Sequence, residues 1–241
     1  MIHVGTSGWS YDHWQGVLYP KGTPASRRLD CYVARFHTVG VNSTFYHWPP
    51  DSRFEGWRRR LPEGFLMSVK APRGLTHGAR LYAPETWLTR ILRGVQHLGR
   101  KMGVLLVQLP PTLPYDHARL AYFLERLPSW PRFAVEFRHE SWHREEVFAL
   151  LESRGVAYCI MSGAHLPCVL RLTAPFAYIR LHGPDPHHLY GGSYPDADLH
   201  WWAERIREFV GRGREVFVYF NNDACGFAVQ NAATLRTILG V

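Results

Sequence analysis

Short apolar runs that end in polar residues recur eight times along the chain. Each run is rich in Val, Ile, Leu, Phe or Tyr and is bounded by Gly, Pro or Asn, a pattern typical of β-strands. The runs are apolar almost throughout, as expected of parallel strands buried on both faces. We therefore predict eight strands, at residues 2–5, 38–42, 65–70, 103–108, 133–138, 156–161, 177–182 and 215–221.

Apolar residues at helical spacing fill most of the gaps between these runs. The clearest case spans residues 84–98, where Trp87, Leu88, Ile91 and Val95 fall on one face of a helix. The connection at 162–175 is short and poorly helical. Helices are predicted at 27–37, 84–98, 117–127, 145–153, 198–210 and 228–239, with Gly99, Gly155 and Gly211 at positions typical of helix C-caps.

Strands that alternate with helices form either a closed (β/α)8 barrel or an open, doubly wound sheet. No predicted strand-to-helix turn carries GxGxxG or GxxxxGK[ST], the glycine-rich fingerprints of nucleotide-binding open sheets. We therefore favour a single (β/α)8 TIM-type barrel, whose usual length fits this chain of 241 residues. There is no linker-like or low-complexity segment, and we predict one domain over residues 1–241.

Composition adds a preference for anionic partners. The net charge is +8, which favours phosphates, nucleic acid or acidic small molecules, although the basic residues are spread along the chain. The one tight basic run, residues 58–60, is interpreted as a solvated helix face. The four cysteines show no metal-binding or paired spacing and are expected to be free thiols, with Cys159 in the core.

No apolar stretch is long enough to span a membrane, and the first residues do not resemble a signal peptide. We therefore expect a cytoplasmic protein without a membrane partner. Nothing in the sequence fixes its oligomeric state.

Several long motifs resemble one known family. They are residues 5–11, 41–46, 69–73, 105–111, 135–139, 180–183 and 219–223, with further matches at isolated positions between and after them. Together they are similar to the YecE-like family, domain of unknown function 72, over almost the whole chain. The resemblance implies a (β/α)8 barrel and no established activity. One departure is Asn42, which stands where the resemblance leads us to expect a glutamate.

The predicted barrel places the strand-end side chains at one mouth. Glu136 and Arg138 are two residues apart, as are Arg180 and His182, so each pair shares a side of its strand. An alternative interpretation is that Glu136 merely pairs with a cation. The candidate catalytic residues are His182, Glu136 and Lys70, and the candidate substrate-binding residues are Arg138, Arg180, Asn221, Asn222, Asp223, Gln108, Asn42, Arg73 and Tyr46.

Each of these candidates has a chemical rationale. His182 titrates near neutrality and is the first candidate for a general acid or base, with Glu136 second. Lys70 either binds an anion or forms a Schiff base, and we favour the anion. Asp223 is interpreted as the N-cap of the last helix rather than as a catalytic group. Too few His, Asp and Glu residues gather to predict a bound metal, and no cofactor is predicted.

Two loop features remain open. Residues 184–195 contain His187, His188, Tyr190 and two glycines, and they form either a mobile lid or an ordinary surface loop. The aromatic residues after the first two strands either stack a base or sugar or pack against each other, and packing is favoured. These residues are Trp9, Tyr11, Trp14, Phe45, Tyr46 and Trp48.

Three functions are consistent with these residues. The first is an enzyme acting on a phosphorylated or otherwise anionic substrate, for example in phosphoester or nucleic-acid hydrolysis. The second is a nucleic-acid-binding protein without catalysis, whose binding would weaken steeply with salt. The third is an isomerase or lyase that acts on a small phosphorylated metabolite through Lys70.

Overall fold

Eight parallel strands form the centre of the fold, as the hydrophobic pattern predicts. The computed structural model describes residues 1–241. Its strands follow the order β1-β8-β7-β6-β5-β4-β3-β2, and a parallel bridge between Ser7 and Gly40 joins the ends of β1 and β2. The chain is therefore a (β/α)8 barrel. The strands are β1 (Ile2–Thr6), β2 (Thr38–Val41), β3 (Leu66–Lys70), β4 (Met102–Gln108), β5 (Arg132–Glu136), β6 (Ala157–Ser162), β7 (Phe176–Leu181) and β8 (Glu215–Phe220).

Burial of both strand faces explains why these runs are apolar. Every residue of β2, β4 and β7 is buried, and the only half-buried residues of β3 are Leu66 and Lys70, at its two ends. A strand covered on both faces cannot alternate apolar and polar residues, so polar side chains gather at strand ends. Cys159, in the middle of β6, is fully buried as predicted.

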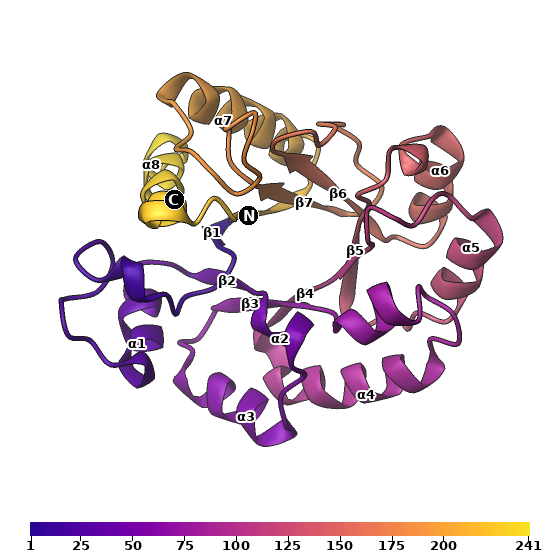
Figure 1. The fold of residues 1–241 in the computed structure, drawn as a ribbon, viewed down its shortest axis with the longest axis horizontal. Helices are drawn as coiled ribbons and strands as arrows, with labels where there is room; N and C mark the ends of the chain where they lie inside the picture. Colours follow the sequence, from indigo (N-terminus) through magenta and orange to yellow (C-terminus); the bar gives the residue numbers. More distant parts are fainter. The chain divides into compact units, whose positions relative to one another are not determined.

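Backbone contacts divide the chain into two compact units, which are described separately. Unit 1 contains residues 1–40, 160–168 and 175–241. Its helices are α1 (Arg28–Val33), α7 (Asp196–Gly211) and α8 (Phe227–Leu239). Helix α7 packs on α8 and β8, while α8 also packs on β1 (Figure 1). The packed face of α7 buries Leu199, Trp202, Ile206 and Phe209, at the spacing expected of an amphipathic helix.

Unit 2 contains residues 41–159 and 169–174. Its helices are α2 (Ser43–Tyr46), α3 (Asp51–Arg60), α4 (Glu85–Val95), α5 (His117–Glu125) and α6 (Glu145–Ser153). A 3₁₀ segment, η4 (Gln96–Lys101), follows α4 and packs against α3 (Figure 1). A short π-helical turn, η3 (Gly74–Gly78), follows β3.

The predicted helices all exist, but several of their ends differ from the prediction. Helix α1 ends at Val33 rather than continuing to residue 37. Gly211 is not a C-cap: it is the last residue of α7, and the chain reverses two residues later at Gly213, where φ is +73°. No helix follows β6 before β7, as the sequence predicts. No helix in the structure is long and apolar enough to cross a membrane.

Candidate functional site

Three neighbouring strands of unit 2 end in polar side chains. Strand β3 ends at Lys70, β4 at Gln108 and β5 at Glu136. Gln108 and Glu136 are directly paired across the two strands. Because the strands are parallel, their carboxyl ends meet at the same edge of the barrel, where (β/α)8 enzymes carry their active sites.

Glu136 is fully buried and is occupied by neighbouring groups. Its Oε1 accepts a hydrogen bond from Nε of Arg138, and its Oε2 lies 3.7 Å from the thiol of Cys159. The Arg138 side chain is itself only 6% exposed. A buried carboxylate is tolerated when a cation and hydrogen bonds compensate for its lost hydration. This geometry favours a role for Glu136 in fixing Arg138 over a role as a free general base.

His77, in the π-helical turn η3, lies within a group of cations. Burial and the charges of Lys70, Arg73 and Arg138 lower the pKa of His77 below its ordinary value. Its Nδ1 lies 2.9 Å from the hydroxyl of Thr76. We call Lys70, Arg73, His77 and Arg138 the His77 cluster. The imidazole of this cluster is uncharged near neutral pH, and the three cations around it form a positively charged site.

Phe45 connects two members of the His77 cluster. The Nζ of Lys70 lies 4.1 Å from the centre of the Phe45 ring, and the His77 ring meets Phe45 edge to face with 5.0 Å between centroids. A cation over an aromatic face is stabilised electrostatically. The hydroxyl of Thr44 also donates to the Lys70 carbonyl at 2.7 Å, which attaches α2 to the end of β3. These contacts fix the position of Lys70 at the end of β3.

Gln108 supplies an acceptor atom that the protein leaves unsatisfied. Its Oε1 is buried and has no hydrogen-bond partner among the protein atoms. An unpaired buried amide oxygen costs free energy, and such groups are uncommon in folded proteins. A ligand or water that donates a hydrogen bond would satisfy it.

The other unit 2 candidates have different surroundings. Arg73 is exposed, begins the η3 turn and belongs to the His77 cluster. Asn42 is half-buried at the start of α2, where its side chain makes no capping bond. Tyr46 is 72% exposed, and its one contact is with the ring of Phe45. Arg73 therefore lies in the same group as Lys70, Glu136 and Arg138. Tyr46 lies outside this group.

The strand ends of unit 1 carry their own polar residues. Arg180, in β7, is 2% exposed and its guanidinium lies 3.4 Å from the Oγ of Ser7. His182 follows β7 and is fully buried, with its Nδ1 3.1 Å from the amide nitrogen of Asn221. The amide donates to this ring nitrogen, which fixes the orientation of the imidazole.

Asn222 serves the fold of a loop. Its amide donates to the Gly192 carbonyl at 2.9 Å and to Oδ1 of Asn231 at 2.8 Å. Asn231 in turn accepts from the backbone of Tyr194 and donates to the Oγ of Ser193. This buried network ties residues 192–194 to α8, which gives Asn222 a structural role.

Asp223 is not the helix cap that the sequence suggests. Its side chain accepts no backbone hydrogen bond, although the residue stands at the N-cap position of a 3₁₀ turn before α8. It accepts instead from Nε1 of Trp14 at 2.6 Å and pairs with Nε2 of His13 at 3.2 Å. The indole and imidazole compete successfully for the carboxylate because the loop after β1 lies beside it. Burial raises the pKa of Asp223.

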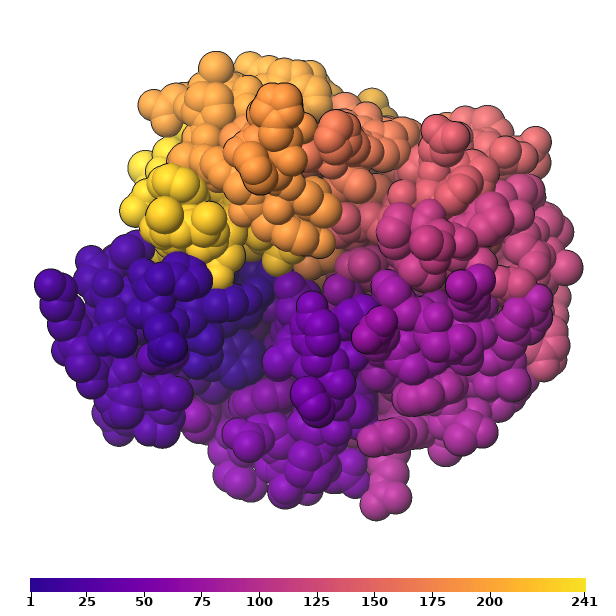
Figure 2. All heavy atoms as spheres, viewed as in Figure 1, coloured from indigo at the N-terminus to yellow at the C-terminus, as the bar shows by residue number.

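The loop at 184–195 packs through its last residues. Tyr194 is buried, and its hydroxyl accepts from Gly183 N at 3.0 Å and lies 3.2 Å from Ser162 Oγ. In Figure 2 this loop belongs to the orange part of the chain and lies at the surface of unit 1. Ser162, Pro184 and Tyr194 help to line an open hollow of about 440 Å³.

Sequence reasoning missed two histidines at these strand ends. His77 lies in an irregular π-helical turn, which has no apolar periodicity to mark it. His13 comes from a short 3₁₀ turn after β1, and its link to Asp223 joins residues far apart in the sequence. The motif around residues 73–77 was the one available signal, because a basic residue and a histidine follow closely after a predicted strand.

Comparison with known proteins agrees with this architecture. A DUF72 protein of Thermotoga maritima MSB8 has a similar crystal structure, with 29% identity, all of both chains covered and a TM-score of 0.90. One from Enterococcus faecalis V583 is 21% identical, with a TM-score of 0.86 over all of this chain and 96% of the other. A D-psicose 3-epimerase shares the fold alone, with 11% identity and a TM-score of 0.59 over 91% and 95% of the two chains.

Fold and strand-end residues together define the chain as a (β/α)8-barrel protein with polar groups at the carboxyl ends of its strands. The family model described as "Protein of unknown function DUF72" matches residues 3–241, and the chain belongs to this family. A curated relative is the UPF0759 protein YunF of Bacillus subtilis strain 168. It is 26% identical over 281 aligned residues, which cover all of this chain and 95% of YunF.

Proposed function

We propose that this protein is an enzyme that binds a phosphorylated or otherwise anionic small molecule at the strand ends of β3, β4 and β5. The observation that carries the proposal is the excess of positive charge in the His77 cluster. Lys70, Arg73 and Arg138 all act on one half-buried imidazole. Glu136 pairs with Arg138, so this part of the site holds three cations and one carboxylate, a balance that attracts an anion.

The chemistry of the cluster assigns a role to each member. Lys70 and Arg73 bind the anionic group, and Arg138 is held rigidly by Glu136 so that its remaining donors have a fixed direction. The neutral imidazole of His77 can accept a proton from the substrate. Gln108 offers its unsatisfied oxygen to a hydroxyl or amine of the same molecule.

The geometry disfavours two of the functions that the sequence left open, Schiff-base chemistry at Lys70 and binding of nucleic acid by base stacking. The contact between Lys70 and Phe45 stabilises an ammonium, which favours anion binding over Schiff-base chemistry. Binding of nucleic acid by stacked bases needs exposed aromatic rings; Phe45 is buried under Lys70, which leaves the exposed Tyr46 as the ring of α2 that could stack a base. In unit 1, His182 stays a separate candidate for proton transfer.

Calorimetric titration with sulfate, which mimics a phosphate group, tests the binding step. We expect the Lys70→Met and Arg73→Gln variants each to lose about tenfold in affinity. Arg90→Gln removes an exposed charge from α4 outside the cluster, so its affinity should match that of the unchanged protein. Absence of binding at about 10 mM sulfate, or equal losses in all three variants, would refute the proposal.

A turnover screen tests the catalytic step. A panel of phosphomonoesters, phosphodiesters and sugar phosphates is incubated with the protein, and products are followed by phosphorus NMR. Turnover that disappears in His77→Gln while sulfate affinity persists supports the assigned proton transfer. Turnover that survives in His77→Gln and disappears in His182→Ala would move the proton transfer to His182.

A further inference from the structure

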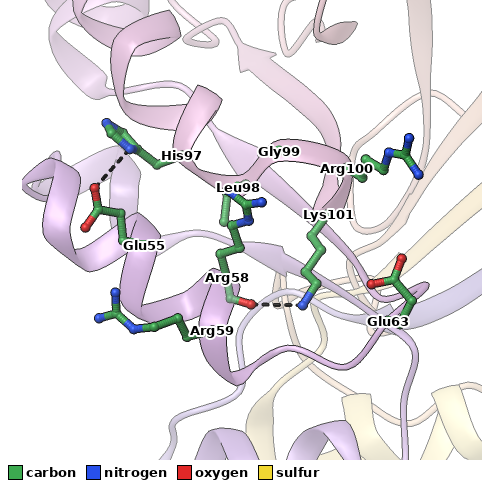
Figure 3. A pocket seen from close by; sticks show the side chains of 9 residues that line it. All are labelled: Glu55, Arg58, Arg59, Glu63, His97, Leu98, Gly99, Arg100 and Lys101. Carbon is green, nitrogen blue, oxygen red and sulfur yellow. Dashed lines mark hydrogen bonds and ion pairs between the residues drawn. The ribbon is translucent and has the colours of Figure 1, made fainter.

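A second concentration of positive charge lies at the opposite ends of β3 and β4. A surface hollow of about 650 Å³ is formed by the last turn of α3, the chain that follows it, and η4 (Figure 3). The chain after α3 leads into the start of β3, and η4 leads into the start of β4. The His77 cluster, by contrast, lies at the carboxyl ends of these strands. The seven residues of β4 separate the two places by about 20 Å. We call this hollow the basic hollow; its lining is Glu55, Arg58, Arg59, Glu63, His97, Leu98, Gly99, Arg100 and Lys101.

Three arginines of the basic hollow have no acidic partner. Arg58, Arg59 and Arg100 are exposed, and no carboxylate lies within 4.0 Å of their guanidinium groups. Many other surface arginines of this chain are paired, as Arg126 is with Glu85. Arginines without an acidic partner that line one hollow raise its electrostatic potential.

The acidic side chains nearby do not neutralise this charge. The Glu55 carboxylate lies 3.1 Å from Nδ1 of His97 rather than on an arginine (Figure 3), and Nε2 of His97 lies 3.6 Å from Asp51. Glu63 is exposed and forms no ion pair. The hollow therefore keeps an excess of positive charge.

Among the basic residues of the hollow, Lys101 stabilises the end of α3, whereas Arg58 makes no ion pair. The Nζ of Lys101 donates to the carbonyls of Arg58, at 2.9 Å, and Leu61, so it completes the C-terminus of α3. The guanidinium of Arg58 lies over Gly99, where a side-chain carbon would come within 3.5 Å of it. Gly99 has a φ of +56° and leaves this space open. Arg58 is thus placed by the backbone, and not by an ion pair.

The lining also indicates what kind of anion fits. Leu98 is the one apolar side chain in it, and no Phe, Tyr or Trp lines the hollow to stack a base. The guanidinium groups of Arg59, Arg58 and Arg100 are spread across the hollow (Figure 3), and a linear chain of phosphates can reach more than one of them, because each planar group can bind two oxygen atoms. A ligand recognised here is rich in phosphate and needs no base.

We propose that the basic hollow is a binding site for a linear oligophosphate, such as a free polyphosphate chain or the phosphate tail of a nucleotide. The site is independent of the function proposed for the His77 cluster. Binding uses Arg58, Arg59 and Arg100, and Lys101 stays on the backbone of α3. Neighbouring phosphates engage separate arginines, so affinity grows with the number of linked phosphates.

Calorimetric titrations of the full chain with tripolyphosphate, orthophosphate and ATP in magnesium-free buffer test this site. We expect tripolyphosphate to bind at least about tenfold more tightly than orthophosphate. The double variant Arg58→Gln with Arg100→Gln should lose at least about tenfold in tripolyphosphate affinity. Arg90→Gln, the matched removal of an exposed and unpaired arginine, should keep it. Thermal unfolding of each variant verifies that it is folded.

Further arms separate the possible outcomes. ATP that binds as tightly as tripolyphosphate supports recognition of the phosphate tail. A single-stranded oligonucleotide or ATP that binds about tenfold more tightly would overturn base-free recognition. Loss of tripolyphosphate binding in Lys70→Met, with no loss in the double variant, would overturn the site itself while leaving the His77 cluster as the anion site.

Discussion

Replacing Glu136 with alanine tests whether this residue holds the candidate site together. The side chain is fully buried, its oxygens meet Arg138 and Cys159, and the Arg138 side chain is almost as buried. Removing the carboxylate leaves a guanidinium in a poorly hydrated place without its counter-charge. Breaking a buried ion pair from one side costs about 3–5 kcal/mol of unfolding free energy.

The expected loss is large enough to measure in two ways. For a chain of this size, 1 kcal/mol corresponds to about 2–4 °C in Tm, so Glu136→Ala should unfold about 6–20 °C earlier. Urea unfolding gives the free energy directly. The matched control is Glu145→Ala, which removes the carboxylate of an exposed pair with Arg171 and should cost at most about 1 kcal/mol.

A double-mutant cycle makes the test specific to the pair. If Glu136 acts mainly on Arg138, then Arg138→Met in the Glu136→Ala background should restore part of the lost stability, because the uncompensated charge is gone. A loss below about 1 kcal/mol in Glu136→Ala, or no recovery in the double variant, would refute the positioning role. Glu136 would then again be a candidate for a free base.

The remaining predictions concern charge, a loop and cooperativity. A bound anion raises the pKa of His77 from its lowered value in the free protein, so sulfate affinity should increase as the pH falls from neutrality towards that lowered pKa, and His77→Gln should flatten this dependence in calorimetry. Asn42→Glu adds a carboxylate at the start of α2, the helix whose Thr44 and Phe45 contact Lys70, and should weaken sulfate binding about fivefold, or about 1 kcal/mol, whereas Asn42→Gln should not. Asn231→Ala breaks the buried network with Tyr194 and should cost about 1–3 kcal/mol in urea unfolding. If residues 1–241 form one domain, calorimetric heating should show one transition, and two separate transitions would contradict this.

The positions of the strands could be predicted closely because both of their faces are buried. A strand covered on both faces has to be apolar from end to end, so its boundaries are visible as the first polar residue. The predicted run 103–108 and the observed β4 (Met102–Gln108) end at the same residue, and the run 177–182 exceeds β7 by a single residue. The candidate site residues were chosen because they are polar and lie at the predicted carboxyl ends of these strands.

Local features that depend on distant partners could not be predicted in this way. Asp223 was expected to cap a helix because its local sequence allows it, but Trp14 and His13 come from the other end of the chain and take its oxygens. Gly211 was expected to end α7, yet the helix includes it and the positive φ falls at Gly213. Both predictions were wrong because they used only the neighbouring sequence, whereas the observed structure at these positions depends on residues outside it.

The charge of the candidate site shows the same limit at the level of function. The sequence places Lys70, Arg73, Arg138 and Glu136 at or just after neighbouring strand ends, and this composition alone does not tell which of the three cations the one carboxylate contacts. The structure adds their arrangement: Glu136 accepts a hydrogen bond from Arg138, Lys70 lies over the ring of Phe45, and the charge of Lys70 helps to lower the pKa of His77. The residue count gives the excess of cations, and the pairing decides where the excess charge lies. It follows that the affinity for anions depends on keeping Glu136 on Arg138, so a variant that frees this carboxylate should weaken anion binding even though no cation has been removed.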